Sequence, residues 1–402
     1  MKKTAVAVAV AASALGMSQF AVADFVKDSK LSLDLRNYYF AQETDNAAEG
    51  GQWGQAFMLN YKSGFTEGAV GFGVDLFGGV GYRLADHGDY TGGMLFQHDG
   101  QEASDRLNKA GATLKARVGG TTAYLGALRP NTPVFVANDA RLLPQIVEGV
   151  LVTNQDIAGL TLSAAHVTKV SHRDSDTWDE LGSEELSLVG ADYKVMDGLT
   201  AQYYYSKWNN NYGQHFAGLK YAAALGAGKL GADLRYFNTS PTGEENGGQV
   251  APNGDRFDDN KLWSALVNYS IAGHTVGLGY QEVSGDTGFK QVSNSNYAIS
   301  ERMIGAGLMT NAEEKVTLVS YGFDFGTVGV KGLNASVIHQ MGDGGTANFD
   351  RTETDVVVGY SVPEGQFKGL GARLMHGMYR PDGNRADIDQ TRFIVNYSIP
   401  LM

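Results

Sequence analysis

The sequence predicts an all-β protein, folded as a closed transmembrane antiparallel β-barrel of about 18 strands. Three observations favour this fold class. Apolar and polar residues alternate along most of the chain, short and long connections take turns, and the chain begins with a signal for export. A strand that faces lipid on one side and an aqueous lumen on the other shows this alternation.

The N-terminus has the pattern of a secretory signal peptide. Lys2 and Lys3 form a short positive region, a run of small apolar residues extends over 5–17, and Ala21 and Ala23 provide a small-x-small cleavage pattern. The apolar run is too short for a membrane anchor of about 20 residues. We therefore expect residues 1–23 to be removed, and residues 24–402 to form the barrel.

Period-2 alternation replaces helical periodicity along the remaining chain. Aromatic residues stand near the ends of the apolar faces, as in the girdles that flank a membrane-spanning barrel. The clearest alternating stretches are 31–36, 57–62, 114–118, 230–237 and 392–399. A soluble β-sandwich is the alternative, but it seldom needs so many hairpins in one domain.

The connections between these stretches alternate in length. Short glycine-rich turns are expected at 66–68, 119–121, 197–198, 226–228, 272–273 and 366–369. Long polar loops are expected at 83–107, 129–145, 172–184, 241–258, 286–311 and 381–387. Tight turns on one side and long loops on the other indicate a membrane barrel, with both termini on the short-turn, periplasmic side. A closure of about 18 strands leaves an aqueous channel.

Composition excludes several function classes. The chain has no cysteine, so it offers no disulfide framework and no thiol chemistry. Removal of Lys2 and Lys3 leaves 30 basic and 44 acidic residues, a net charge of −14. An acidic total argues against nucleic acid as a partner. No apolar run after residue 24 reaches the length of a membrane-spanning helix.

Several segments, in order along the whole mature chain, resemble the OprD-type outer-membrane porins. The likeness begins with the alternating first strand and includes the Asn138-Asp139-Ala140-Arg141 segment. The stretches that carry it are 25–40, 63–68, 70–75, 138–145, 157–162, 215–219, 279–281, 285–287 and 389–397.

The resemblance implies an 18-stranded monomer in the bacterial outer membrane, in contact with its lipid and lipopolysaccharide. It implies passive, selective uptake of small solutes, usually bearing a carboxylate. It also implies that the third loop folds inward and narrows the pore, and that a ladder of basic wall residues guides the solute carboxylate. A nonspecific general-diffusion porin, which is commonly a trimer, is the alternative function.

The position of a basic residue in the alternating pattern decides whether it belongs to the expected ladder. A basic side chain on the lipid face costs about 2–4 kcal/mol at mid-membrane, so basic residues out of phase with the apolar face are expected to point inward. Arginine suits a carboxylate because its planar fork offers two parallel donors. Asp34 or Asp233 could instead neutralise some of these residues. The predicted ladder comprises Arg36, Lys115, Arg117, Arg235, Arg373 and Arg392.

The expected constriction is 129–148, in which prolines stiffen the chain by fixing φ. Arg129 stands at its beginning, and Asp139 and Arg141 lie in its second half. The family resemblance and the loop position favour Arg141 as a substrate contact. The alternative is an internal brace in which Arg141 pairs with Asp139. Tyr124 is expected on the facing wall.

The chain departs from the family pattern at two expected rungs. Ile338-His339 stands where the family commonly has Arg-Tyr, and Met375 stands where it commonly has an arginine. A thinner ladder weakens the expected preference for anions, although Arg373 could substitute for one rung.

An enzyme in the barrel wall is a remote alternative, because nucleophilic chemistry would need a serine beside a histidine on the lipid face. His166, His339 and His376 have no evident serine partner at barrel spacing. Asp387 and Asp389 do not have the spacing of a calcium loop. We therefore expect no catalytic site, no cofactor and no metal.

Overall fold

The computed structural model describes residues 25–47, 49–88, 95–99, 102–181, 185–242, 258–292 and 309–402. The predicted signal peptide, 1–23, lies outside the described residues, as does most of the predicted loops 241–258 and 286–311. Within the described ranges, no helix is both long and apolar enough to cross a bilayer.

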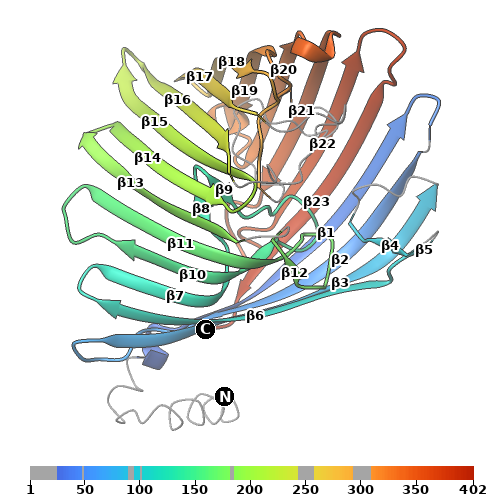
Figure 1. Ribbon diagram of the computed structural model, residues 1–402. Helices are drawn as coiled ribbons and strands as arrows, with labels where there is room; N and C mark the ends of the chain where they lie inside the picture. The colour runs from blue at the N-terminus through green and yellow to red at the C-terminus, as the bar shows by residue number, and fades with distance from the viewer. Residues whose placement is uncertain are drawn as a thin grey trace.

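The described chain forms a closed barrel of 18 long antiparallel strands, which confirms the predicted fold class (Figure 1). The long strands are β1 (Lys30–Thr44), β2 (Gly50–Lys62), β3 (Gly71–Gly88), β6 (Arg106–Val118), β7 (Thr121–Leu128), β10 (Ile146–Asn154), β11 (Leu160–Ser171), β13 (Leu186–Met196), β14 (Leu199–Trp208), β15 (Tyr212–Leu225), β16 (Gly228–Pro241), β17 (Asn260–Ile271), β18 (His274–Gly285), β19 (Lys315–Asp324), β20 (Leu333–Gly342), β21 (Arg351–Ser361), β22 (Gly371–Pro381) and β23 (Ile388–Pro400).

Short elements decorate the connections. They are the two-residue strands β4 (His98–Asp99), β5 (Glu102–Ala103), β8 (Asn131–Thr132), β9 (Phe135–Val136) and β12 (Asp179–Glu180), and the 3₁₀ turns η3 (Phe325–Val328) and η4 (Gly345–Ala347). The β8–β9 hairpin lies inside the ring of strands (Figure 1).

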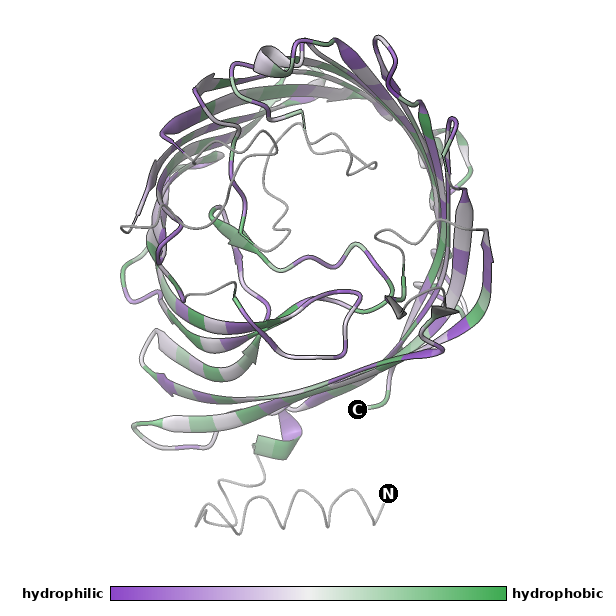
Figure 2. Cartoon of the chain, turned by 45° about the vertical axis from the view of Figure 1, so that its right-hand side comes forward, coloured by the Kyte–Doolittle hydropathy of each residue, from purple (hydrophilic) through white to green (hydrophobic). Residues whose placement is uncertain are grey.

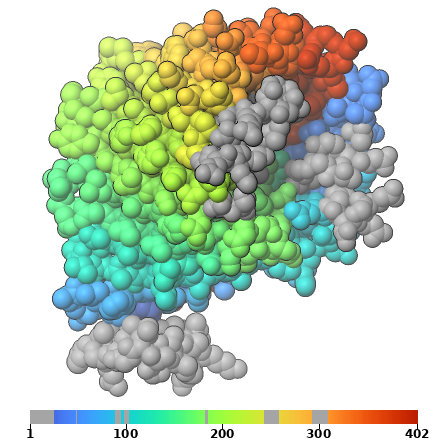
Figure 3. Space-filling model, in the orientation of Figure 1, coloured from blue at the N-terminus to red at the C-terminus, as the bar shows by residue number. Residues whose placement is uncertain are grey.

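The ring closes where the first strand meets the last. β1 pairs with β23 from Ser32↔Pro400 to Thr44↔Ile388. In the space-filling view the red C-terminal strands accordingly lie beside the blue N-terminal ones (Figure 3). Closure removes the open sheet edges that a bilayer does not tolerate.

The two faces of the wall have the reverse of a soluble protein's polarity. Outward leucines are exposed: Leu114 is 58% and Leu278 is 60% accessible. Polar side chains such as Gln52 and Gln214 are instead fully buried on the inner side. The hydropathy colouring changes residue by residue along each strand (Figure 2). The predicted alternation therefore separates the residues that face lipid from those that face the lumen.

Two-residue turns join several strands on one side, including 197–198 and 272–273. Gly198 and Gly273 there have φ of 79° and 87°, a conformation that glycine adopts without strain. On the other side the predicted loop 83–107 begins too early, because β3 continues to Gly88 and pairs with β2 up to Gly50. The backbone pairing between β2 and β3 continues here beyond the membrane. The polar residues of this extension look like a loop in the sequence, because alternation alone does not distinguish the two.

Candidate functional site

The third long loop, L3 (129–145), crosses the lumen between β7 and β10, as predicted. It begins at Arg129, and β10 takes over at Ile146, so residues 146–148 of the expected constriction belong to the wall. The loop bonds to itself at both ends. Ala137 N–H donates to the Pro130 carbonyl at 2.8 Å, and Gln145 N–H donates to the Asn138 carbonyl at 2.8 Å.

The first half of L3 is anchored in an apolar cluster. Val134 and Phe135 are fully buried, and they pack with aromatic residues of β14–β16 such as Tyr204, Phe216 and Phe237. Burying side chains of this size stabilises the docked loop by about 1.5–3 kcal/mol each.

The second half of L3 has its own anchor on the other side of the lumen. Leu142 and Leu143 are fully buried against Tyr38, Phe40 and Met58 of β1 and β2. The Tyr38 hydroxyl also donates to the Ala140 carbonyl at 3.2 Å. L3 is therefore held at two separate points of the wall, with its charged residues near the second one.

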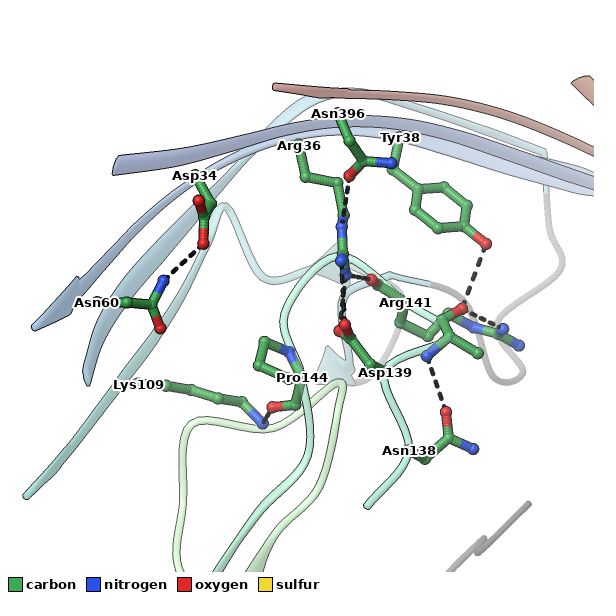
Figure 4. Close-up of polar contacts among 11 residues, drawn as sticks. Asp34, Arg36, Tyr38, Asn60, Lys109, Asn138, Asp139, Arg141, Pro144 and Asn396 are labelled. Carbon is green, nitrogen blue, oxygen red and sulfur yellow. Dashed lines mark hydrogen bonds and ion pairs between the residues drawn. The ribbon is translucent and has the colours of Figure 1, made fainter. Parts of the chain in front are cut away.

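Arg36 is the polar brace of the second half (Figure 4). Its guanidinium donates to both Asp139 carboxylate oxygens at 2.8 and 3.2 Å, to the Arg141 carbonyl at 2.6 Å and to Asn396 at 3.0 Å. Asp139 thus pairs with Arg36, whereas the alternative weighed from the sequence had it pairing with Arg141. Asp34 instead accepts from Asn60 at 2.7 Å.

Two other guanidinium groups meet at Phe40. Arg141 and Arg392 lie 5.0 and 5.7 Å from the centre of its ring. Arg141 donates to the Ala140 carbonyl at 3.0 Å, and Arg392 donates to the Gln390 amide oxygen at 2.7 Å. Burial, followed by the nearby Arg392, lowers the pKa of Arg141 to about 9, so it stays protonated at pH 7. Two positive charges, one from L3 and one from β23, therefore lie close together at Phe40.

Arg129 stands over a recess beside L3. Its guanidinium lies 4.2 Å from the centre of the Phe77 ring. The recess, of about 490 Å³, is also lined by Asp34, Asp75 and Tyr124. The structure thus brings Tyr124 to the same space as Arg129, with two carboxylates.

Lys115 and Arg117 lie together toward the periplasmic end of β6. Lys115 is buried, and it bonds to Asp75 at 2.6 Å and to the Ser63 carbonyl at 2.7 Å. Arg117 is exposed, with its guanidinium 4.4 Å from the centre of the Phe65 ring. An acidic partner therefore neutralises one member of this pair.

Arg235 lies across the lumen, beside the first half of L3. It forms a two-point ion pair with Asp233, at 3.0 and 2.8 Å, the alternative that the sequence left open. Arg235 faces a recess of about 280 Å³ that is also lined by Asp192, Tyr204 and Pro133, and Asp233 lies on the same inward face of β16 as Arg235. Asp192 accepts hydrogen bonds from Tyr204 and Gln202.

The two departures from the family ladder occupy different surroundings. Met375 is the register partner of Arg392, and exposed Arg373 lies two residues below it on β22. Ile338 is the register partner of Asp355, which is buried on β21 beside Glu353. One missing rung therefore borders a positive region and the other borders an acidic one.

Two buried charges that hold the loops were not predicted from the sequence. Lys109 donates to the carbonyls of Pro144 at 3.0 Å and Ser171 at 3.2 Å, and also to that of His172. Arg351 forms a two-point pair with Glu314, at 2.8 and 2.5 Å. The alternation on β6 could have indicated that Lys109 points inward. Its carbonyl partners were not predictable, because they depend on how L3 and the next loop fold.

The expectation that His166 has no serine partner is wrong. His166 Nδ1 lies 3.0 Å from Ser187 Oγ on the outer face, and its Nε2 lies 3.3 Å from Glu185. Adjacent strands bring these residues together, which chain spacing does not reveal. The same histidine–hydroxyl pairing recurs at His339–Thr354 and His376–Thr391. The repetition favours a structural cross-strand pair. Asp387 and Asp389 pair with Arg380 at 3.3 and 2.9 Å.

Known proteins resemble this chain over most of its length. The family model described as "outer membrane porin, OprD family" matches residues 23–401. Porin D of Pseudomonas aeruginosa is 31% identical over 368 residues, covering 84% of this chain and 80% of that protein. Porin-like protein GalP of Pseudomonas putida is 30% identical over 323 residues, covering 77% of each.

Solved structures give the same result. The crystal structure of Pseudomonas aeruginosa OccK8 (OprE) matches with a TM-score of 0.85 and 35% identity, over 94% of this chain and all of that one. The crystal structure of Pseudomonas aeruginosa OpdK with vanillate matches with a TM-score of 0.85 and 30% identity, also over 94% of this chain and all of that one.

Proposed function

Because the chain belongs to the OprD family of outer membrane porins, we propose that it admits small carboxylate-bearing solutes by passive diffusion, with Arg141 and Arg392 as the carboxylate contact. The observation that carries this proposal is the meeting of these two guanidinium groups at Phe40, one from L3 and one from β23.

Fixed positive charge in a narrow lumen with low-dielectric walls raises the local concentration of anions. A guanidinium binds a carboxylate through two parallel hydrogen bonds. Flux also requires that binding be weak and spread over several sites, so that the solute leaves again. A pair of arginines at one constriction, followed by weaker basic positions, meets both conditions.

The predicted basic residues would then have different roles. Arg36 braces L3 through Asp139. Lys115 and Arg235 are neutralised by Asp75 and Asp233, and would contribute little to anion attraction. The exposed Arg117, Arg129 and Arg373 would form the weaker sites along the path. The relative OpdK was solved with vanillate, which carries a carboxylate; this supports the solute class proposed here.

The proposal includes export and assembly. Residues 1–23 would be removed on export, and residues 24–402 would work as a monomer in the outer membrane, surrounded by lipid and lipopolysaccharide. A nonspecific general-diffusion pore is the competing function, since acidic residues Glu353 and Asp355 also face the lumen beside a missing rung.

Single-channel recording in planar bilayers distinguishes the two functions. We expect benzoate to interrupt the current, and benzamide, its neutral analogue, to leave the current unchanged. Charged hydrogen bonds contribute about 1.5–3 kcal/mol, so Arg141→Ala should weaken the benzoate effect about tenfold or more. Lys331→Ala, at an exposed ion pair with Glu364, is the control and should change nothing. Equal interruption by both solutes would favour the nonspecific pore.

A further inference from the structure

Lys109 joins two loops of the pore from one point of the wall. It lies on β6, it is 5% exposed, and its register partner on β3 is Gly79. Its ammonium donates to the Pro144 carbonyl of L3 at 3.0 Å (Figure 4). It also donates to the Ser171 carbonyl at 3.2 Å and to the His172 carbonyl, where β11 passes into the next loop. Because three carbonyl acceptors match the three N–H donors of the ammonium, Lys109 ties the two loops together.

The next loop, L4 (172–178), forms a compact turn at this contact. The His172 carbonyl accepts from the Ser175 N–H at 3.1 Å as well as from Lys109. Ser175 is buried, and its hydroxyl lies 2.8 Å from the Thr177 hydroxyl. Because Lys109 bonds to the backbone of a folded turn, a shift of this turn is transmitted to the ammonium.

The contact on L3 belongs to the segment that presents Arg141. The Asn138 N–H donates to the Gln145 amide oxygen at 2.9 Å, and the Gln145 N–H donates back to the Asn138 carbonyl at 2.8 Å. These two bonds close the segment into one unit, and Pro144 stiffens it by fixing φ. The Pro144 carbonyl and the Arg141 guanidinium are therefore parts of one closed segment, and they move together.

L4 also acts on Arg141 through charge. After burial and Arg392, the nearby Arg173 lowers the pKa of Arg141, and Asp174 raises it. Arg173 and Asp174 both belong to the turn that the Lys109 ammonium holds. A displacement of L4 therefore changes the electrostatic potential at Arg141.

We propose that Lys109 is a positioning residue of the carboxylate site, which couples L4 to the second half of L3. This inference rests on the proposed function, in which Arg141 and Arg392 contact the solute carboxylate. With the ammonium in place, L4 and the segment that presents Arg141 keep one relative position. Without it, each loop is held only by its own contacts, and the charges of Arg173 and Asp174 no longer keep a fixed distance from Arg141.

Double electron–electron resonance tests the coupling without any solute. The chain has no cysteine, so Ala140→Cys on L3 and Asp176→Cys on L4 place two nitroxide labels in the full-length mature barrel. We expect a narrow distance distribution when Lys109 is present. Lys109→Met keeps a long side chain but has no donor, and it should broaden the distribution about twofold or more. Lys109→Gln, with two N–H donors, should give an intermediate width.

Benzoate block in planar bilayers tests whether the coupling reaches the carboxylate site. Asp174→Asn removes a negative charge near Arg141, so it should strengthen benzoate block about threefold in the otherwise wild-type chain. In Lys109→Met the same substitution should have little effect, because Asp174 no longer keeps a fixed distance from Arg141. Lys207→Met removes an exposed lysine of β14 and is the control, in which the threefold effect of Asp174→Asn should persist.

Two results would overturn the proposal. Equal distance distributions with Lys109 and with Lys109→Met would show that the loops keep their relative position without the ammonium. An undiminished effect of Asp174→Asn in Lys109→Met would show that the lysine does not set the distance between L4 and Arg141. Absence of benzoate block in the wild type would overturn the proposed function, whereas the distance measurement would still decide the coupling. Bilayer conductance of each variant confirms that the barrel has folded.

Discussion

The two ends of L3 are anchored in the same way but differ in charge. Val134 and Phe135 are buried against β14–β16, and Leu142 and Leu143 are buried against β1 and β2. Beside the first anchor, Arg235 is held by Asp233 two residues away. Beside the second, Arg141 and Arg392 donate to neutral oxygens of Ala140 and Gln390.

Under the proposed function, an inward position is necessary but not sufficient for a basic residue to attract a solute. Arg235 and Arg392 both point inward at comparable positions on their strands. A carboxylate at i−2 neutralises Arg235, whereas the residue at i−2 from Arg392 is the amide Gln390. An ion pair at close range cancels most of the field that an anion would feel at a distance.

Truncating the two anchors separately should have the largest effects. Phe135→Ala and Leu142→Ala each leave a cavity, at a cost of about 3–5 and 2–5 kcal/mol of loop docking. Because only the second anchor holds Arg141, both variants should increase current noise in single-channel records, but only Leu142→Ala should reduce anion selectivity. Equal selectivity loss in both would contradict the division of L3 into two functional halves.

Arg36→Ala should have the next largest effect, because it removes four hydrogen bonds, three of them to L3. Loss of such a brace at a partly exposed site should cost about 1–3 kcal/mol and allow the second half of L3 to move. We expect a larger and more variable conductance. Arg235→Ala, which breaks an ion pair within one strand, should leave the conductance close to wild type.

Restoring the two missing rungs should have unequal effects. Met375→Arg places a third charge beside Arg392, and should raise the anion-to-cation permeability ratio a few-fold. Ile338→Arg places the new charge beside Asp355, and should change the ratio little. Reversal potentials across a salt gradient measure both. An equal gain from the two variants would show that neighbouring carboxylates do not set the field.

The smallest effect is expected at a periplasmic turn remote from both anchors. A hydrogen bond from the Gly120 N–H, and then one from Asn154, lower the pKa of Asp156. A carboxyl with a lowered folded-state pKa contributes stability above its ordinary pKa and loses it as pH falls. Asp156→Asn should therefore destabilise slightly at pH 7 and not near pH 2. Urea unfolding at the two pH values checks this, and a pH-independent difference would argue against it.

Much of the site was predictable from the sequence at the level of single residues. Alternation on β1, β16 and β23 identified Arg36, Arg235 and Arg392 as inward, and the prolines and position of 129–145 indicated a stiff loop. The pairings were not predictable. Asp139 reaches Arg36 from 103 residues away, and Ser187 meets His166 from a neighbouring strand. Such contacts depend on strand register and loop docking.

The sequence by itself determined the barrel. Each strand must present an apolar face to lipid and a polar face to water, and this requirement fixes the polarity of alternate residues along the strand. Only the tertiary structure decided the charge of the pore. Closure brings β23 beside β1, and the two apolar anchors carry L3 across the lumen. Whether an arginine there meets a carboxylate or a solute depends on distances of a few ångströms between segments far apart in the chain.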